Sequence, residues 1–473
     1  MPANNAQKSS TSSFSARRTA IAEQDVAEGL DRACLNETRL RFLELNTLRA
    51  QRLRASLLDS QQVFLDLLPL LFHVNHASLP GYVADVPCGV ANFKVGREHV
   101  KAARSVAKSF ALQRDPNAST AIDGIYLIGS CGSLAHNNRS DIDIWICTAT
   151  SPGESERAAL QKKCDEISSW AATLKIEAHF FIMHDQSFRE ARRAPMDAEN
   201  CGRTQHYLLL DELYRSLIVA AGNPPLWWMV PSSHSDNYSN YAKTLLEKRH
   251  IKPDECTDFG CASQIPAAEF ISAGVWQLYK GISSPYKALL KLMLVEAYAA
   301  DPELSTLSAE LKQRIYQGDY ELDELDPYLQ VYRRVEQYLL ANEQTERLEL
   351  ARRCLYFKVG VKLSKAPEAE APEQHGASAD STRSWRRDLM QKLVAKWGWR
   401  RPQLRMLDES QDWSFNEVVA EQHRLTRELV QSYRLLSTLA KRHQEQRTDN
   451  TQNGTGSDTE NNNAGFEQDA REL

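Results

Sequence analysis

The fold class is decided by one stretch of the chain: Gly129-Ser130-Cys-Gly-Ser-Leu-Ala-His-Asn-Asn-Arg-Ser140-Asp141-Ile-Asp143-Ile144. A short apolar run, 124–128, ends at the Gly-Ser pair, and aspartate alternates with isoleucine from Asp141 onward. This period of two predicts a strand, 141–147, that follows a strand and a turn. Residues two apart on a strand share a face, so Asp141 and Asp143 point the same way while the isoleucines pack inward.

Two carboxylates held side by side repel each other, and a hard divalent cation relieves that repulsion. Mg²⁺ prefers carboxylate and phosphate oxygens. At the preceding turn, Gly129 permits close backbone approach, and the N–H and hydroxyl of Ser130 can hold phosphate oxygens. A third acid, Glu177, lies between apolar residues on a later predicted strand, 176–183. Three such acids suit two metal ions about 3.5–4 Å apart.

The segments around this motif predict an α+β fold in which a small mixed sheet is followed by a large all-helical domain. Helical spacing covers 24–72 and 154–174. After about residue 205 helices dominate, with helical patterns at 206–221, 267–298, 307–317, 326–341, 346–363 and 384–443.

Composition shifts then set the expected domain boundaries. We expect a disordered tail at 1–22, an N-terminal helical segment at 23–94, the catalytic domain at 95–220 and the helical domain at 221–443. A linker rich in Ala, Glu and Pro interrupts the helical domain at about 367–380, and a disordered polar tail covers 444–473.

Bulk composition excludes several classes of protein. The 473 residues carry a net charge of −5, whereas general nucleic-acid binders are usually strongly basic. The 9 cysteines include no C-x-x-C pair, which favours reduced thiols and a cytoplasmic location. No apolar run reaches the length of a membrane span, and the N-terminus lacks the pattern of a secretory signal.

The Gly-Ser turn, the Asp-x-Asp strand and the third acid together resemble the polymerase-β-type nucleotidyltransferase superfamily. The amino-acid sequence around these residues resembles the class I adenylate cyclases of enterobacteria, and this resemblance extends over about residues 45–443. Further blocks that carry this resemblance are His73-Val-Asn-His76, Pro80-Gly81-Tyr82, Cys201-Gly-Arg-Thr204-Gln205-His206-Tyr-Leu-Leu-Leu-Asp211-Glu212, Trp276-Gln277-Leu-Tyr-Lys280, Ser284-Pro-Tyr-Lys287-Ala288, Arg352-Arg353-Cys354 to Leu363, Trp397-Gly-Trp399 and Gln431-Ser-Tyr-Arg434.

The resemblance implies conversion of ATP to 3′,5′-cyclic AMP and diphosphate. It implies that Asp141 and Asp143 bind two Mg²⁺ ions, with Mn²⁺ as a possible substitute, and that Glu177 assists the ion that activates the 3′-hydroxyl. It also implies that Gly129 and Ser130 hold the β- and γ-phosphates. The expected nucleotide site further includes Ser140, directly before the acids.

Several residues keep two interpretations each. Lys280, Lys287 and Lys291 either reach the triphosphate, with Lys287 preferred, or form a solvated helix face. Thr204 and Gln205 open an apolar helix whose N-terminus either binds phosphate or is simply capped by Thr204.

For other residues, a structural role is either favoured over a functional one or equally plausible. His73 and His76 are expected to be structural rather than metal ligands. His179 shares a strand face with Glu177 and is either near the site or a packing residue. The basic segment with Trp385, Trp397 and Trp399 is expected to be an amphipathic helix rather than a membrane or nucleic-acid surface.

Two other functions remain open on the motif alone. One is nucleotidyl transfer from ATP to an external protein, RNA or small-molecule acceptor, and the other is ATP sensing without turnover. Longer members of the family carry a C-terminal regulatory half that responds to the sugar phosphotransferase system, so such partners are expected only if that half exists.

Overall fold

The computed structural model describes residues 32–112, 120–137, 140–190, 205–262, 265–301, 305–318, 321–365 and 380–453. The expected N-terminal tail and nearly all of the expected linker lie outside these ranges, as do Thr204 and residues 454–473. We call residues 32–262 the sheet region and residues 265–453 the helical region.

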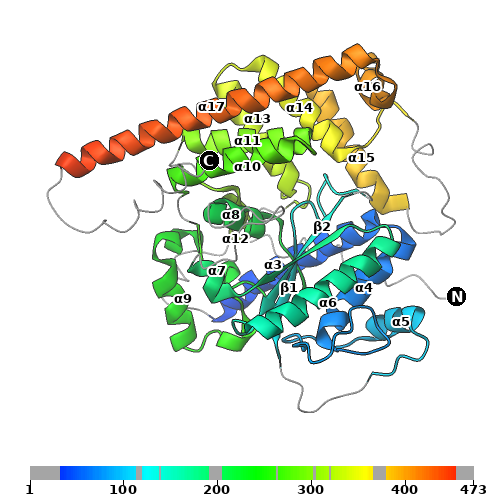
Figure 1. Cartoon of the computed structure of the whole chain (residues 1–473). Helices are drawn as coiled ribbons and strands as arrows, with labels where there is room; N and C mark the ends of the chain where they lie inside the picture. The colour runs from blue at the N-terminus through cyan, green and yellow to red at the C-terminus, as the bar shows by residue number, and fades with distance from the viewer. Residues whose placement is uncertain are drawn as a thin grey trace.

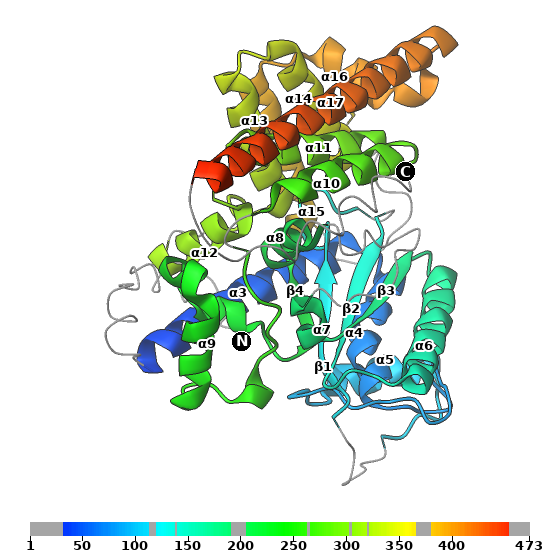
Figure 2. The ribbon, with the colours of Figure 1, turned by 60° about the vertical axis from the view of Figure 1, so that its left-hand side comes forward.

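A four-stranded mixed sheet forms the centre of the sheet region (Figure 2). Its strands are β1 (Ile122–Ile128), β2 (Ile142–Thr148), β3 (Ala178–Met183) and β4 (Ile218–Gly222), in the order β3-β2-β1-β4. β1 is antiparallel to β2 and β4, whereas β2 and β3 are parallel. The expected α+β class, with a small mixed sheet before a large helical part, is therefore confirmed.

Alternation along the strands gives the sheet two buried faces. Ile125, Leu127 and Ile144 pack with the core of α4 and α6, whereas Tyr126 and Trp145 pack with the core of α8 and α3. The helices of this region are α3 (Arg32–Ser56), α4 (Asp59–His73), α5 (Arg97–Val106), α6 (Glu154–Thr173), α7 (Asp185–Arg189), α8 (His206–Ser216) and α9 (Tyr238–Glu247). Asp143 of β2 shares the Trp145 face by parity, so it projects toward α8.

The helical region has its own core. Its helices are α10 (Ala267–Gly281), α11 (Pro285–Ala300), α12 (Leu307–Gln317), α13 (Pro327–Ala341), α14 (Thr345–Val359), α15 (Asp380–Trp397), α16 (Arg401–Asp408) and α17 (Phe415–Asn453). Figure 1 shows α17 lying along α10 and α11, with α13 and α14 beside them. Gly318 and Gly360 adopt the left-handed backbone that ends α12 and α14.

Several boundary predictions were wrong. In the described residues, the stretch expected to be helical over 24–72 contains two α-helices, that over 384–443 contains three, and α14 ends at Val359 rather than at 363. The helix expected over 206–221 ends at Ser216, because Ile218 and Val219 enter the sheet, where β4 pairs with β1. The helix expected over 267–298 is two helices, since Pro285 can begin a helix but not continue one. The expected polar tail is helical at its start, because α17 continues to Asn453.

Some of the residues with a structural interpretation make structural contacts. Trp397 and Trp399 are buried in the helical core, and the guanidinium of Arg52 lies 3.7 Å from the ring centre of Trp385. The Nδ1 atom of His73 accepts a hydrogen bond from the Val90 N–H at 3.1 Å. In the described ranges no helix has the length and apolarity that crossing a membrane requires.

The loop after β1 joins the two regions. Leu134, six residues beyond the strand, is buried in the helical core. Its N–H donates to the Asp326 carboxylate at 2.6 Å, and its carbonyl accepts from Arg386 Nε at 2.9 Å. Residues 129–137, which we call the β1 loop, are therefore positioned by both regions at once.

Candidate active site

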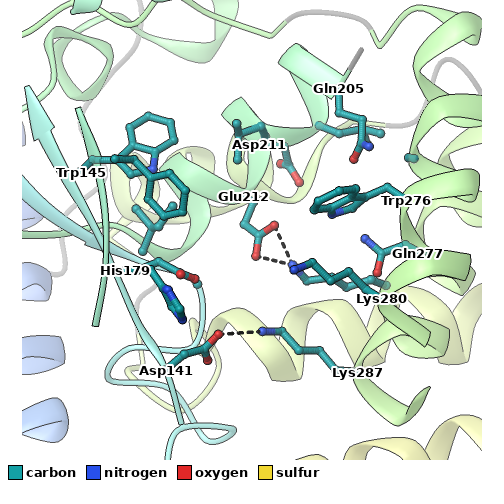
Figure 3. A pocket seen from close by; sticks show the side chains of 18 of the residues that line it. Asp141, Trp145, His179, Gln205, Asp211, Glu212, Trp276, Gln277, Lys280 and Lys287 are labelled. Atoms are coloured by element: carbon teal, nitrogen blue, oxygen red, sulfur yellow. Dashed lines mark hydrogen bonds and ion pairs between the residues drawn. The ribbon is translucent and has the colours of Figure 1, made fainter. Parts of the chain in front are cut away.

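A cleft of about 1120 Å³ lies where the sheet meets the helical region (Figure 3). Its walls combine the sheet end at Gly129, Asp141 and Asp143 with residues of α8, α10, α11 and the end of α14. Ligand sites usually have volumes of roughly 300–1,000 Å³, so this cleft has room for a nucleotide.

Asp141 and Asp143, the acid pair, stand at the cleft edge of β2. Asp143 lies opposite Ile128 across the β1–β2 ladder, directly beside the turn that begins at Gly129. Gly129 has a φ of +80°, and a Cβ there would lie 3.2 Å from Asp143 Oδ2. Glycine therefore provides both the turn and the open space beside the carboxylate.

The two carboxyl groups differ in their electrostatics. Burial and then the neighbouring Asp141 raise the pKa of Asp143 to about 6. Burial alone would raise the pKa of Asp141 too, but Lys287 and then Lys358 lower it below its ordinary value. The acid pair thus holds more negative charge than its surroundings fully compensate, which is a setting that attracts a cation.

Lysines from α11 face these acids across the cleft. Lys287 Nζ lies 3.7 Å from Asp141 Oδ2, and Tyr328 and then the acid pair raise the pKa of Lys287. Lys291 Nζ bonds both carboxylate oxygens of Glu212 on α8, at 2.7 and 2.9 Å. Against the effect of burial, Lys291 and Arg215 lower the pKa of Glu212 to about 2.

Glu177 lies at the same edge, and its side chain is largely exposed. Its carbonyl accepts from the Ile142 N–H at 2.9 Å, so its backbone runs beside the start of β2. Its side chain is 69% exposed, and Oε1 lies 3.2 Å from Nε2 of His179, the residue opposite Asp143 in the parallel ladder. Both side chains line the cleft.

The donor set suits a divalent cation only in part. The acid pair offers two carboxylates on one strand face, which is oxygen chemistry that Mg²⁺ and Mn²⁺ accept. Within the described ranges, however, no three His, Cys, Asp or Glu side chains are grouped closely enough to hold a metal as they stand. A third ligand from Glu177 would require its side chain to turn toward the acid pair.

Of the phosphate ligands expected between β1 and β2, two line the cleft and one does not. Gly129 and Ser140 line the cleft. Ser140 Oγ also accepts the Asn137 N–H at 3.1 Å, which closes the turn before the acid pair. Ser130 is buried beneath the loop, with Oγ 3.5 Å from His136 Nδ1, and it does not line the cleft.

The start of α8 is already occupied by a carboxylate. Glu269 of α10 accepts the N–H groups of Tyr207 and Leu208 at 2.9–3.1 Å. A phosphate at this helix end would have to displace Glu269. Gln205 lines the cleft and donates from Nε2 to the Ser272 carbonyl at 3.2 Å.

The remaining predicted lysine, Lys280, also lines the cleft, with Nζ 5.0 Å from the ring centre of Trp276. The structure adds residues that the sequence did not single out for the site, namely Glu212, Trp276, Gln277 and Lys358. Trp276 and Gln277 stand within a block that carried the family resemblance. Glu212 and Lys358 also stand within such blocks, at 201–212 and 352–363, although neither residue was singled out there.

Comparison with protein families decides where the chain belongs. The family model described as "Adenylate cyclase NT domain" matches residues 34–228, and the model described as "Adenylate cyclase, class-I, second domain" matches residues 265–458. The chain belongs to the class I adenylate cyclase family. The acid pair lies within the first match, and Lys287 and Lys358 lie within the second.

Individual members of this family give the same result. The chain is 37% identical to proteins named adenylate cyclase from Shigella flexneri and from Escherichia coli K12, over 84% of this chain and 46% of theirs. A protein of the same name from Proteus mirabilis is 36% identical over 84% of this chain and 45% of its own. The chain thus spans about half the length of these relatives.

Proposed function

We propose that this chain converts ATP to 3′,5′-cyclic AMP and diphosphate. Family membership supports this, as do relatives that are named adenylate cyclase. The observation that carries the proposal is the acid pair, set at the edge of a nucleotide-sized cleft and facing Lys287 at 3.7 Å from Asp141 Oδ2.

The cleft walls suggest how ATP lies. Figure 3 shows Asp141 and Lys287 at one end, with Gln205 and Trp276 at the other. The charged end suits the triphosphate. At the other end, the indole of Trp276 offers a stacking surface, and the amides of Gln205 and Gln277 offer hydrogen bonds to a base edge. The ribose would then lie between them, near the acid pair.

The reaction is an internal displacement. The ribose 3′-oxygen forms a bond to the α-phosphorus as the bond to the bridging oxygen of the diphosphate breaks, and the proton of the 3′-hydroxyl passes to solvent water. Two magnesium ions held by Asp141 and Asp143, or manganese in their place, would activate that hydroxyl and offset the charge on the leaving diphosphate. Mg²⁺ as the ion, two as the number and Glu177 as a further ligand are parts of this proposal.

Side chains of the protein would position the substrate and balance the charge of its phosphates. Asp141 and Asp143 would fix the place of attack, because they stand at the start of a strand that the sheet holds in place. Lys287 balances Asp141 in the free protein. When a cation is bound by the acid pair, its ammonium is available to the phosphate oxygens. Glycine at position 129 lets the phosphate chain approach the backbone closely.

Product identification tests this proposal. We expect purified protein, ATP and Mg²⁺, without any acceptor, to yield cyclic AMP and diphosphate in equal amounts by mass spectrometry. Transfer of AMP to an added protein, RNA or small molecule, with no cyclic AMP, would instead favour an external acceptor. Bound ATP with no product of either kind would favour a sensing role.

A further inference from the structure

Lys358 is a partly buried cation of the cleft that forms no ion pair with a described acid. Lys287 pairs with Asp141, and Lys291 pairs with Glu212. Lys358, in the last turn of α14, also lines the cleft, yet no hydrogen bond or ion pair joins it to any described residue. Its Nζ lies 5.9 Å from the ring centroid of Tyr328.

The fold holds this lysine against the β1 loop. Gly360 ends α14 just beyond it, and a Cβ at Gly360 would lie 3.7 Å from Asn137 Nδ2. Arg386 of α15 bridges the two segments, since it donates to the carbonyls of both Leu134 and Val359. The end of α14 that carries Lys358 therefore lies beside the β1 loop, and Lys358 itself lines the cleft.

The surroundings of Lys358 carry excess positive charge. Burial and then Lys287 lower the pKa of Lys358 to about 8, and Lys291 and Arg386 act in the same direction, while Asp141 opposes them. At the loop itself, burial and then Arg386 and Lys358 lower the pKa of His136 to about 3. A lysine without an acid partner, set among other cations, is stabilised when an anion enters.

We propose that Lys358 is the anchor for the terminal phosphates of a nucleoside triphosphate, whose chain it holds against the β1 loop. Lys287, closer to the acid pair, would face the α-phosphate. This assignment rests on the proposed function for the identity of the ligand as a nucleotide. The geometry alone requires only a polyphosphate chain that runs from the acid pair toward the β1 loop.

Binding without turnover tests the assignment. Isothermal titration of ATP, AMP and inorganic tripolyphosphate would be measured in Ca²⁺ for the wild type and for Lys358→Gln. Loss of a charge-assisted contact should weaken ATP and tripolyphosphate binding about tenfold or more, and AMP binding less than twofold. Lys358→Arg should keep most of the affinity.

Lys392→Gln is the matched control, because Lys392 is an exposed lysine of α15 that does not line the cleft. ATP affinity that falls equally in this variant, or an equal loss of ATP and AMP binding in Lys358→Gln, would overturn the assignment. If Lys358→Gln fails to fold, Lys358→Met serves as the second variant. A chain that binds ATP through Lys358 but forms no cyclic AMP would contradict the proposed function alone.

Discussion

Asp143 is placed where a charged carboxylate is unfavourable in the free protein. Its pKa is raised from 3.8 to about 6, first by burial and then by Asp141. The neutral form therefore stabilises the fold at low pH, and that stability is lost as the pH rises from about 4 through about 6. At pH 7.5 the protein carries the unfavourable charge, which is the condition under which a cation should bind.

Asp143→Asn removes that charge. Without divalent cations at pH 7.5, we expect its melting temperature to be higher than that of the wild type by about 1–3 °C. Adding Mg²⁺ should raise the melting temperature of the wild type and change that of Asp143→Asn much less. Scanning fluorimetry measures both. A variant that melts lower than the wild type without metal would show that the carboxylate has another partner.

The titration of Lys358 predicts a second pH dependence, that of ATP affinity, in which a rise in pH removes a positive charge from the cleft. Its pKa is lowered to about 8, so the free protein loses this positive charge as the pH rises above that value. ATP affinity in Ca²⁺ should therefore fall between pH 8 and pH 9.5, by up to about tenfold per unit. Lys358→Arg stays charged and should show a flatter profile. Parallel profiles for the two proteins would contradict the role of Lys358.

At the scale of single residues, the sequence predicted the acid pair better than it predicted Lys358. The period-two pattern was enough to place Asp141 and Asp143 on one face, because strand parity is a local property. Lys358 comes from a helix more than two hundred residues later in the chain. Only the packing of α14 and α15 onto the β1 loop brings it to the cleft, and no local pattern records that packing.

Among the elements, the N-terminus of α13 fixes the β1 loop. Buried Asp326 accepts the N–H groups of Tyr328 and Leu329 at 3.0 Å, as a helix cap, and also the N–H of Leu134 at 2.6 Å. One carboxylate thus caps a helix of the helical region and holds the turn beside the acid pair.

Asp326→Ala should therefore affect stability and ligand binding together. Loss of the cap and of a buried hydrogen bond should lower the free energy of unfolding by about 2–4 kcal/mol, as measured by urea denaturation. The KM for ATP should also rise. The matched control is Thr306→Ala, which removes the α12 cap to the Ala309 N–H, costs about 1 kcal/mol and should leave the KM unchanged. Equal effects on KM would contradict the link from α13 to the loop.

The elements also show why a boundary can be wrong when its neighbours are right. The predicted strand at 176–183 and helix at 154–174 agree closely with β3 and α6 because each pattern is complete within its own segment. The run 206–221 reads as one helix, yet β4 begins at Ile218 because β1 offers an unpaired edge there. Pairing with a distant strand overrides local propensity.

Across the whole molecule, the cleft depends on both matched family segments. The acid pair and β1 loop come from residues within 34–228, whereas Lys287 and Lys358 come from residues within 265–458. Contacts at Leu134 connect them. We therefore expect neither segment alone to bind ATP with the affinity of the chain that contains both.

The measurement that tests the account most directly is the initial rate of cyclic AMP formation by three proteins: the wild type, Asp143→Asn and Asp123→Asn. Asp123 lies on β1 at the opposite end from Ile128 and does not line the cleft, so its change to Asn is the matched control. Since residues that merely support metal ligands change activity by about 10–100-fold, loss of a direct ligand should lower kcat at least about 100-fold. Asp123→Asn should keep a rate near that of the wild type. Near-normal cyclic AMP formation by folded Asp143→Asn would contradict the assignment of the acid pair as the catalytic centre.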